Sequence, residues 1–200
     1  MDPSHLLRRA ALVPVLGLLL VGGATGPAGA ARDAAGGAVV SVQDFSFTAS
    51  TVTVALGQSV TWQFHAMHTS TSDQGFWDSG MRSSGDYAVA FLDAGTFRYH
   101  CSMHPSMTGA VRVPLAAKGS AADGWRLRWS VRASTPPGRR YDVQYRRTGT
   151  HSWTSWRTST AKRSGRFHPV GAGSYLVRAR THQAGVGTSS WSPKRTVTIG

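Results

Sequence analysis

The chain of 200 residues contains no glutamate and a single cysteine. One cysteine cannot form a disulfide within the chain, so Cys101 is either an inert core residue or a residue with a chemical role. No apolar run is long enough to span a membrane securely, because the one run present, residues 11–24, is too short. No segment has a sustained helical period, and this absence favours a protein built from strands.

The first thirty residues have the layout of a secretory signal peptide. Arg8 and Arg9 precede the apolar run, and Ala28–Ala30 have the small-x-small form of a cleavage site. We expect a signal peptide over residues 1–30, an uncleaved anchor being the alternative, and a flexible lead-in over residues 31–37. No cysteine follows the apolar run, so we expect no lipid anchor. No second apolar run predicts a transmembrane segment, so the mature protein is expected to be secreted, either extracellular or associated with the cell envelope.

Charge is divided unevenly along the chain. Residues 31–117 hold four Lys/Arg and six Asp, a net charge of −2, whereas residues 118–200 hold sixteen Lys/Arg and two Asp, a net charge of +14. Such asymmetry indicates two units with different partners.

Short alternating runs of β-forming residues fill both halves of the chain. The first series is VVSVQDF, STVTVAL, QSVTWQF, YAVAFLD, TFRYH and GAVRVPL, and the second is WRLRWSV, RYDVQYRR, SWTSWRT, SYLVRARTH and RTVTIG. This pattern is typical of antiparallel sandwiches of short strands. The sequence predicts an all-β protein with one domain over residues 38–115, a linker over residues 116–123 and a second domain over residues 124–200.

The stretch YHCSMHPSM places His104 three residues after Cys101 and Met107 three residues after that. Strand-like runs flank the stretch, so we expect a tight loop that turns the three side chains toward one point. His68, at the end of VTWQFHAMH, is the candidate for a fourth donor. His100 precedes Cys101, and strand alternation directs it away from the other donors.

These residue types indicate a metal, and copper in particular. Two imidazoles, a thiolate and a weak axial thioether make up the electron-transfer copper arrangement. Zinc accepts Cys and His, but a thioether is a poor ligand for it and zinc has no redox chemistry. A catalytic Cys–His pair is possible in principle, although this crowded loop is not its usual layout. A buried thiol and a core-filling methionine are the structural alternatives.

Residues 38–115 resemble the cupredoxins, the blue copper domains of the plastocyanin and azurin family, and within it the CxxHxxM loop resembles that of amicyanin. The similarity extends over GQSVTWQF, HTSTS and DAGTFRYHCSMHPSMTGAVRV. It implies a Greek-key β-sandwich with one copper ion held by His68, Cys101, His104 and Met107. It favours His68 over His65, which competes for the same role.

The resemblance also implies a function. An exported carrier would transfer single electrons through a type 1 copper site, and it would not be an enzyme, because four protein ligands leave no open position for a substrate. A redox partner would dock near His104, where Met103, Pro105 and Met107 are candidates for an apolar patch. The backbone should donate an N–H to the cysteine sulfur. The alternatives are a Cu(I) trafficking or storage protein, and an adhesion or polymer-binding protein whose first domain is only a scaffold.

The basic half resembles a fibronectin type III domain, a second β-sandwich, with Tyr175 as its corner tyrosine and Trp129 in its core. A charge of +14 is typical either of a solvated face or of a module that attaches to a polyanion, such as a cell-envelope polymer. Nucleic acid is the less expected partner of an exported protein.

Overall fold

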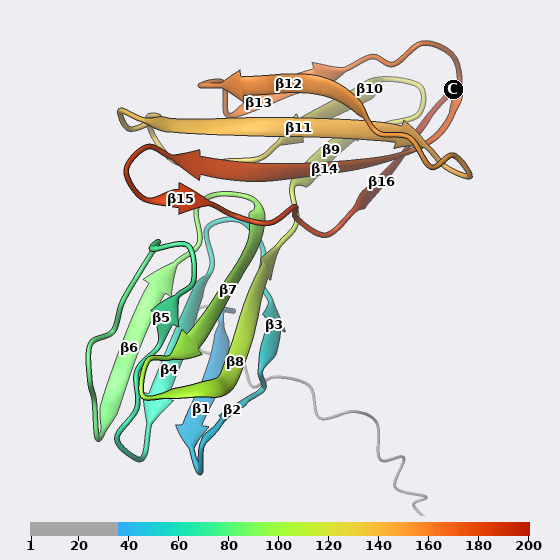
Figure 1. Cartoon of the computed structure of the whole chain (residues 1–200). Coiled ribbons are helices and arrows are strands. Elements are labelled where there is room, and N and C mark those ends of the chain that lie inside the picture. Colours follow the sequence, from blue (N-terminus) through green and yellow to red (C-terminus); the bar gives the residue numbers. More distant parts are fainter. Residues whose placement is uncertain (1–35) are drawn as a thin grey trace, which may run out of the picture.

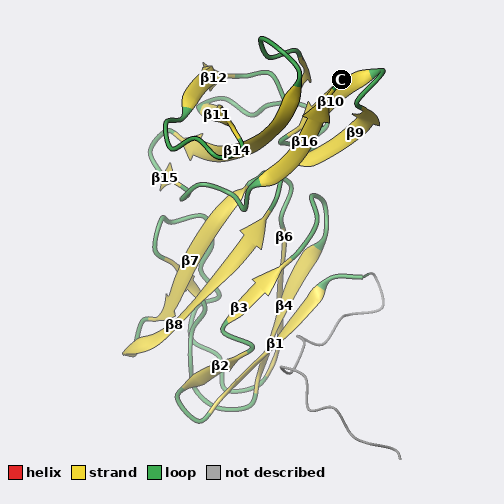
Figure 2. Cartoon of the chain, turned by 90° about the vertical axis from the view of Figure 1, so that its right-hand side faces the viewer, coloured by secondary structure: helices red, strands yellow, loops and turns green. Residues whose placement is uncertain are grey.

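The computed structural model describes residues 36–200, and the expected signal peptide lies outside the described residues. Over that range the chain is built from strands and loops, as Figure 2 shows. No helix among these residues has both the length and the apolar character needed to cross a membrane. The predicted all-β class is confirmed, and the strands fall into two groups that follow one another along the chain (Figure 1).

The first group forms two four-stranded sheets that face each other. One sheet has the order β2 (Ser46–Thr48), β1 (Ala38–Gln43), β4 (Ser59–Phe64), β6 (Gly85–Ala90). The other has the order β3 (Thr51–Thr53), β8 (His104–Val113), β7 (Gly95–Cys101), β5 (Thr71–Ser72). Strands β1 and β4 pair in parallel, as do β3 and β8, and the other pairs are antiparallel.

Alternation along the strands decides which side chains enter the space between the sheets. In β4 the residues Val60, Trp62 and Phe64 are buried, and the residues between them are partly exposed. In β7 the same period buries Phe97, Tyr99 and Cys101. Because side chains of a strand alternate between its two faces, the cysteine sulfur is directed into the sandwich at the very end of β7.

The second group forms another pair of sheets. The first sheet has the order β13 (Ser164–Phe167), β10 (Gly124–Arg128), β9 (Ala116–Ser120). The second has β12 (Thr154–Thr160), β11 (Arg139–Arg147), β14 (Gly173–Gln183) and β15 (Gly187–Thr188), with β16 (Arg195–Ile199) also paired to β14. Trp129, Tyr141 and Phe167 are buried in the core of this unit, which confirms the core position expected for Trp129.

The linker expected over residues 116–123 is largely a strand. Residues 116–120 form β9, which pairs antiparallel with β10 from Ala116↔Arg128 to Ser120↔Gly124. Apart from Lys118 the segment consists of small residues, so it has no hydrophobic period that a sequence pattern could reveal. Its place is fixed by backbone hydrogen bonds instead. The second unit therefore begins one strand earlier than predicted.

Backbone hydrogen bonds join the two units. The Ala94 N–H donates to the Trp129 carbonyl over 2.8 Å, and the Val131 N–H donates to the Leu92 carbonyl over 2.9 Å. Thr96 and Ser190 exchange a reciprocal pair of 2.9 and 3.0 Å. Ala94 also packs into the hydrophobic cluster of the second unit. These contacts continue the sheet bonding across the boundary, so the units meet as one packed structure.

A buried aspartate lies at the same junction. Asp93 is 3% exposed and accepts hydrogen bonds from Arg132 (2.7 Å), Arg139 (3.2 Å) and the Tyr141 hydroxyl (2.9 Å), all of the second unit. Burial is the main cause that raises the pKa of Tyr141 to about 12, so its phenol keeps the proton that it donates. A buried carboxylate is stable only when its charge is paired in this way.

We predict that Asp93→Asn destabilises the fold. The substitution keeps the shape of the side chain but leaves two arginines without their counter-charge, and breaking a buried pair costs about 3 kcal/mol. The free energy of unfolding, measured by urea titration, should fall by an amount of this order. The exposed Asp86 provides the matched control, because Asp86→Asn should change stability by less than about 0.5 kcal/mol. Equal effects of the two variants would contradict this role of Asp93.

Candidate metal centre

Two candidate ligands flank a tight turn between two antiparallel strands. Cys101 is the last residue of β7 and His104 is the first residue of β8, and the two are paired across the turn formed by Ser102 and Met103. A register shift between His100 and Cys101 marks an irregularity at this point of the ladder. Such irregularities re-aim side chains at the ends of sheets, and here the cysteine and the histidine come side by side.

The third candidate ligand comes from a distant part of the chain. His68 follows β4, is 3% exposed, and exchanges two backbone hydrogen bonds of 3.0 Å with Arg82. These bonds join the two ends of the polar segment between β4 and β6 to each other. His65, the competing residue, is exposed and does not belong to the ligand group.

The donor atoms of these three residues converge. His68 Nδ1 lies 3.2 Å from His104 Nδ1, and Cys101 Sγ lies 3.7 Å from the first nitrogen and 3.5 Å from the second. A circle through the three atoms has a radius of about 2 Å, close to the length of metal–imidazole bonds and slightly below that of metal–thiolate bonds. The residues therefore fit a single metal ion among them.

The local electrostatics suit ligation as well. Burial is the main cause that lowers the pKa of His68, and the neighbouring His104 lowers this pKa further, while Asp44 acts in the opposite direction. A lowered pKa keeps the imidazole neutral, and a metal ligand must present a lone pair instead of a proton.

Hydrogen bonds from the surrounding loops hold the cysteine side chain. The Thr69 N–H donates to Cys101 Sγ over 3.4 Å, as expected for a metal-binding thiolate. The Thr69 hydroxyl accepts the Ser102 N–H over 2.8 Å and lies 2.9 Å from the Thr71 hydroxyl. These contacts tie the loop that carries His68 to the turn that carries Cys101, so the two halves of the site cannot move independently.

A second set of bonds supports the loop that carries His68. The Ser70 N–H donates to the Ser79 hydroxyl over 2.8 Å, and the Trp77 indole N–H donates to the Ser70 hydroxyl over 3.0 Å. Trp77 itself packs among the aromatic rings of the core. Its place relative to the site could not be settled from sequence, and the structure shows that it anchors this loop.

Met107 and His100 also occupy defined places. Met107 is 2% exposed and belongs to the same buried cluster as Cys101. It therefore does not contribute to a surface patch around His104, which corrects one expectation, because its strand directs it inward. His100 bonds Asp73 through its ring over 2.7 Å on the outer face of β7, so it points away from the ligand group as predicted.

The sequence analysis missed the residue that covers the site. Phe45, in the turn between β1 and β2, packs its ring against His104 at 4.7 Å and against His68 at 5.8 Å between centroids. Its side chain is nevertheless 69% exposed, and its backbone has a positive φ of 57°. The turn sequence QDFS contains no signal for this role, because the contact depends on how the turn between β1 and β2 meets His104 at the start of β8.

Exposed methionines accompany Phe45 at this end of the molecule. Met67 precedes His68, Met103 precedes His104, and Met81 precedes Arg82, which is bonded to His68. Their side chains are 52%, 40% and 60% exposed, respectively. We call these three methionines together with Phe45 the apolar rim.

No protein-family model matches the chain. Amicyanin of Paracoccus denitrificans is 30% identical over 95 residues, which are 44% of this chain and 72% of that protein.

Solved structures are similar over the same share of the chain. A substituted amicyanin in its reduced Cu(I) form is 30% identical, covers 44% of this chain and 91% of its own, and has a TM-score of 0.37. A purple cupredoxin from Nitrosopumilus maritimus is 20% identical and covers 38% and 97%, with a TM-score of 0.35. On the sequence relationship to amicyanin, the chain belongs to the amicyanin family of cupredoxins.

Proposed function

We propose that this protein transfers single electrons through a type 1 copper site held by His68, Cys101, His104 and Met107. The observation that carries the proposal is the convergence of two imidazole nitrogens and one thiol sulfur on a single point. Copper bound there supplies a one-electron couple between Cu(I) and Cu(II). Soft sulfur and imidazole donors are the ligands that copper prefers for this task.

The residues around the site give the carrier two properties. The hydrogen bonds of Thr69 and Ser70 fix the ligands from both loops, so their positions need not change when the electron is gained or lost. His104 is only partly buried and lies edge-on to the exposed Phe45, so it is the ligand through which a partner reaches the site. A redox partner is proposed to dock at the apolar rim, near His104.

Four protein ligands leave no position for a substrate, so the protein is proposed to act as a carrier and not as an enzyme. Cu(I) trafficking is the second candidate function. The observation that favours it is the exposure of Met67, Met81 and Met103 beside the ligands, because thioethers bind Cu(I) well. The two functions differ in whether a stable Cu(II) form exists.

The second unit is proposed to be a fibronectin type III-like domain that attaches the carrier to a polyanionic polymer of the cell envelope, after export of the mature protein. The Tyr175 hydroxyl lies 2.8 Å from the carbonyl oxygens of Val170 and Gly171, the contact that defines a corner tyrosine. The net charge of +14 over residues 118–200 supports the attachment.

We predict that Cu(II) added to the mature protein gives an intense blue band and a small copper hyperfine splitting. Both come from a thiolate bond, so both should be absent in Cys101→Ser. Visible and paramagnetic resonance spectra of the two proteins provide the measurement. His65→Ala is the matched control and should retain both signals, whereas His68→Ala should lose them.

A colourless protein that oxidises its thiol and releases Cu(I) would contradict the electron-carrier function and favour Cu(I) trafficking. Normal copper spectra in His68→Ala together with their loss in His65→Ala would instead show that the ligand assignment is wrong.

We further predict that Met107→Leu raises the reduction potential. The thioether donates weakly to Cu(II), so its loss favours Cu(I), and a tenfold change in relative affinity equals about 59 mV in a one-electron couple. Voltammetry should show a rise of this order, while the blue band persists. Met103→Leu is the control, because this exposed methionine lies outside the ligand set and its replacement should leave the potential nearly unchanged. An unchanged potential in Met107→Leu would mean that this residue only fills the core.

A further inference from the structure

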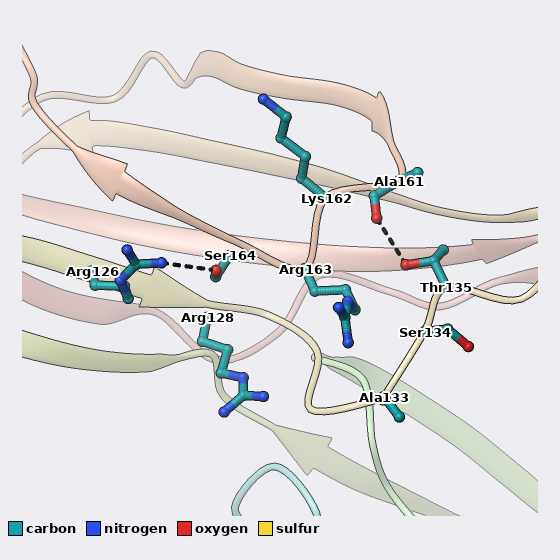
Figure 3. A pocket seen from close by; sticks show the side chains of 9 residues that line it. All are labelled: Arg126, Arg128, Ala133, Ser134, Thr135, Ala161, Lys162, Arg163 and Ser164. Carbon is teal, nitrogen blue, oxygen red and sulfur yellow. Dashed lines mark hydrogen bonds between the residues drawn. The ribbon is translucent and has the colours of Figure 1, made fainter.

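A basic groove of about 800 Å³ lies on the second unit, on the side of the sheet β13–β10–β9. Arg126 and Arg128 of β10 line it together with Ser164 at the start of β13, and the loops of residues 133–135 and 161–163 complete the lining, as Figure 3 shows. The lining contains four cationic side chains and no acidic one. Hydroxyl groups of Ser134, Thr135 and Ser164 make up most of the rest.

The cations continue across the sheet beyond the groove. The register places Arg126 directly opposite Lys118 of β9 and directly opposite Arg166 of β13, and all three side chains are exposed. Residues that are directly opposite on neighbouring strands share one face of the sheet, and like charges in these positions destabilise it. The fold therefore carries a row of three cations that repel one another, with Arg128 next in line along β10.

Nothing among the described residues of the second unit neutralises this row. Asp123 is bonded to Ser120, and Asp142 is bonded to Arg180 and His182 on the other sheet. The ion pairs found within residues 36–200 include none with Lys118, Arg126 or Arg166, so this row has no counter-charge in that part of the chain. An anion bound along it would remove the repulsion that the free protein has to bear.

The arginines of the opposite sheet are engaged differently. Arg178 lies over the rings of Trp153 and Trp191, with its guanidinium carbon 3.8 and 4.5 Å from their centroids, and Arg180 lies over Trp191 at 4.6 Å. Their guanidinium faces are used in packing within the protein. Arg126, Arg128 and Arg166 have no such ring contacts among those found in residues 36–200, so they are the freer anion ligands.

The lining also limits the kind of anion. It contains no aromatic side chain on which a base could stack, and stacking is what single-stranded nucleic acids require. It contains no large apolar side chain that would enter a lipid layer. Alternate residues of one strand are about 7 Å apart, and neighbouring strands are about 5 Å apart, so charges repeat at these spacings over the face.

We propose that this groove, with the adjoining Lys118 and Arg166, binds a linear phosphodiester polymer that lacks bases. Arginine forks pair with phosphate oxygens through two hydrogen bonds. The Ser134 and Ser164 hydroxyls can donate to the same oxygens, whereas the Thr135 hydroxyl already donates to the Ala161 carbonyl. The inference rests on the proposed attachment to a polyanion and specifies its site and its chemistry. It is independent of copper binding.

The test measures the affinity of the mature protein for poly(glycerol phosphate) by isothermal titration calorimetry at several salt concentrations. Arg126→Gln/Arg128→Gln removes two charges from the groove, and Lys194→Gln/Arg195→Gln removes two exposed charges elsewhere on the same unit. We expect the groove variant to bind about tenfold more weakly or worse, and the control variant to change by less than about threefold. The slope of log K against log salt is negative. Its magnitude should decrease by roughly 1.4 in the groove variant, because two phosphate contacts of about 0.7 each are lost.

Thermal unfolding gives an independent readout. The polymer should raise the melting temperature of the unsubstituted protein and of the control variant, because a ligand of the native state stabilises it, and it should fail to do so in the groove variant. A cooperative thermal transition of each variant without polymer, at a temperature close to that of the unsubstituted protein, shows that it is folded. Heparin and vesicles of phosphatidylserine with phosphatidylcholine are the competing probes, and weaker binding of both is expected.

Equal losses of affinity in the two variants would show that the groove is not the binding site. Attachment through net charge would remain supported. Stronger binding to heparin or to vesicles would overturn the phosphodiester assignment. No binding to any polyanion would overturn both the inference and the attachment on which it rests. None of these three results would affect the proposed copper site.

Discussion

Two imidazole nitrogens and a sulfur lie within 3.7 Å of one another at the end of the first sandwich, and polar atoms are stable in such a place only when a framework holds them. Two strands, a bridge from His68 to Arg82 and the Thr69 hydroxyl supply that framework. The sandwich core behind it, with Trp62, Tyr99 and Trp77 in mutual contact, keeps the loops from relaxing apart. The fold therefore prepares the site before any ion enters it.

Much of this arrangement could be predicted from sequence because it depends on short-range rules. Alternation along β7 directs Cys101 inward and His100 outward, and the spacing of Cys101 and His104 suits a two-residue turn. The N–H bond to the cysteine sulfur followed from the chemistry of thiolates.

The features that sequence reasoning missed depend on long-range packing. Phe45 touches His104 only because two distant turns meet at one end of the sandwich. Strand β9 has no large apolar residue, so the pairing with β10, and not its own sequence pattern, defines it. The role of Asp93 required knowledge of which loops of the second unit approach it. A sequence pattern predicts which face of a strand is buried. It does not predict which distant elements pack against each other, and these contacts depend on that packing.

The boundary between the two units has consequences for the whole molecule. Sheet-like hydrogen bonds and a buried carboxylate join them, so the acidic first unit and the basic second unit keep a fixed relation. In Figure 1 the turn between β7 and β8 lies at the end of the first unit that is remote from the second. The charged sheet and the ligand turn thus belong to opposite parts of one elongated structure.

This geometry would make the first unit a rigid spacer that separates the candidate metal centre from the second unit. With the second unit held on a polymer as proposed, the turn between β7 and β8 would project away from the second unit (Figure 1). The proposed attachment and the proposed electron exchange would then use opposite ends, so neither would block the other. A carrier of this shape would exchange electrons with partners that diffuse to it, while the carrier itself stays attached to the polymer.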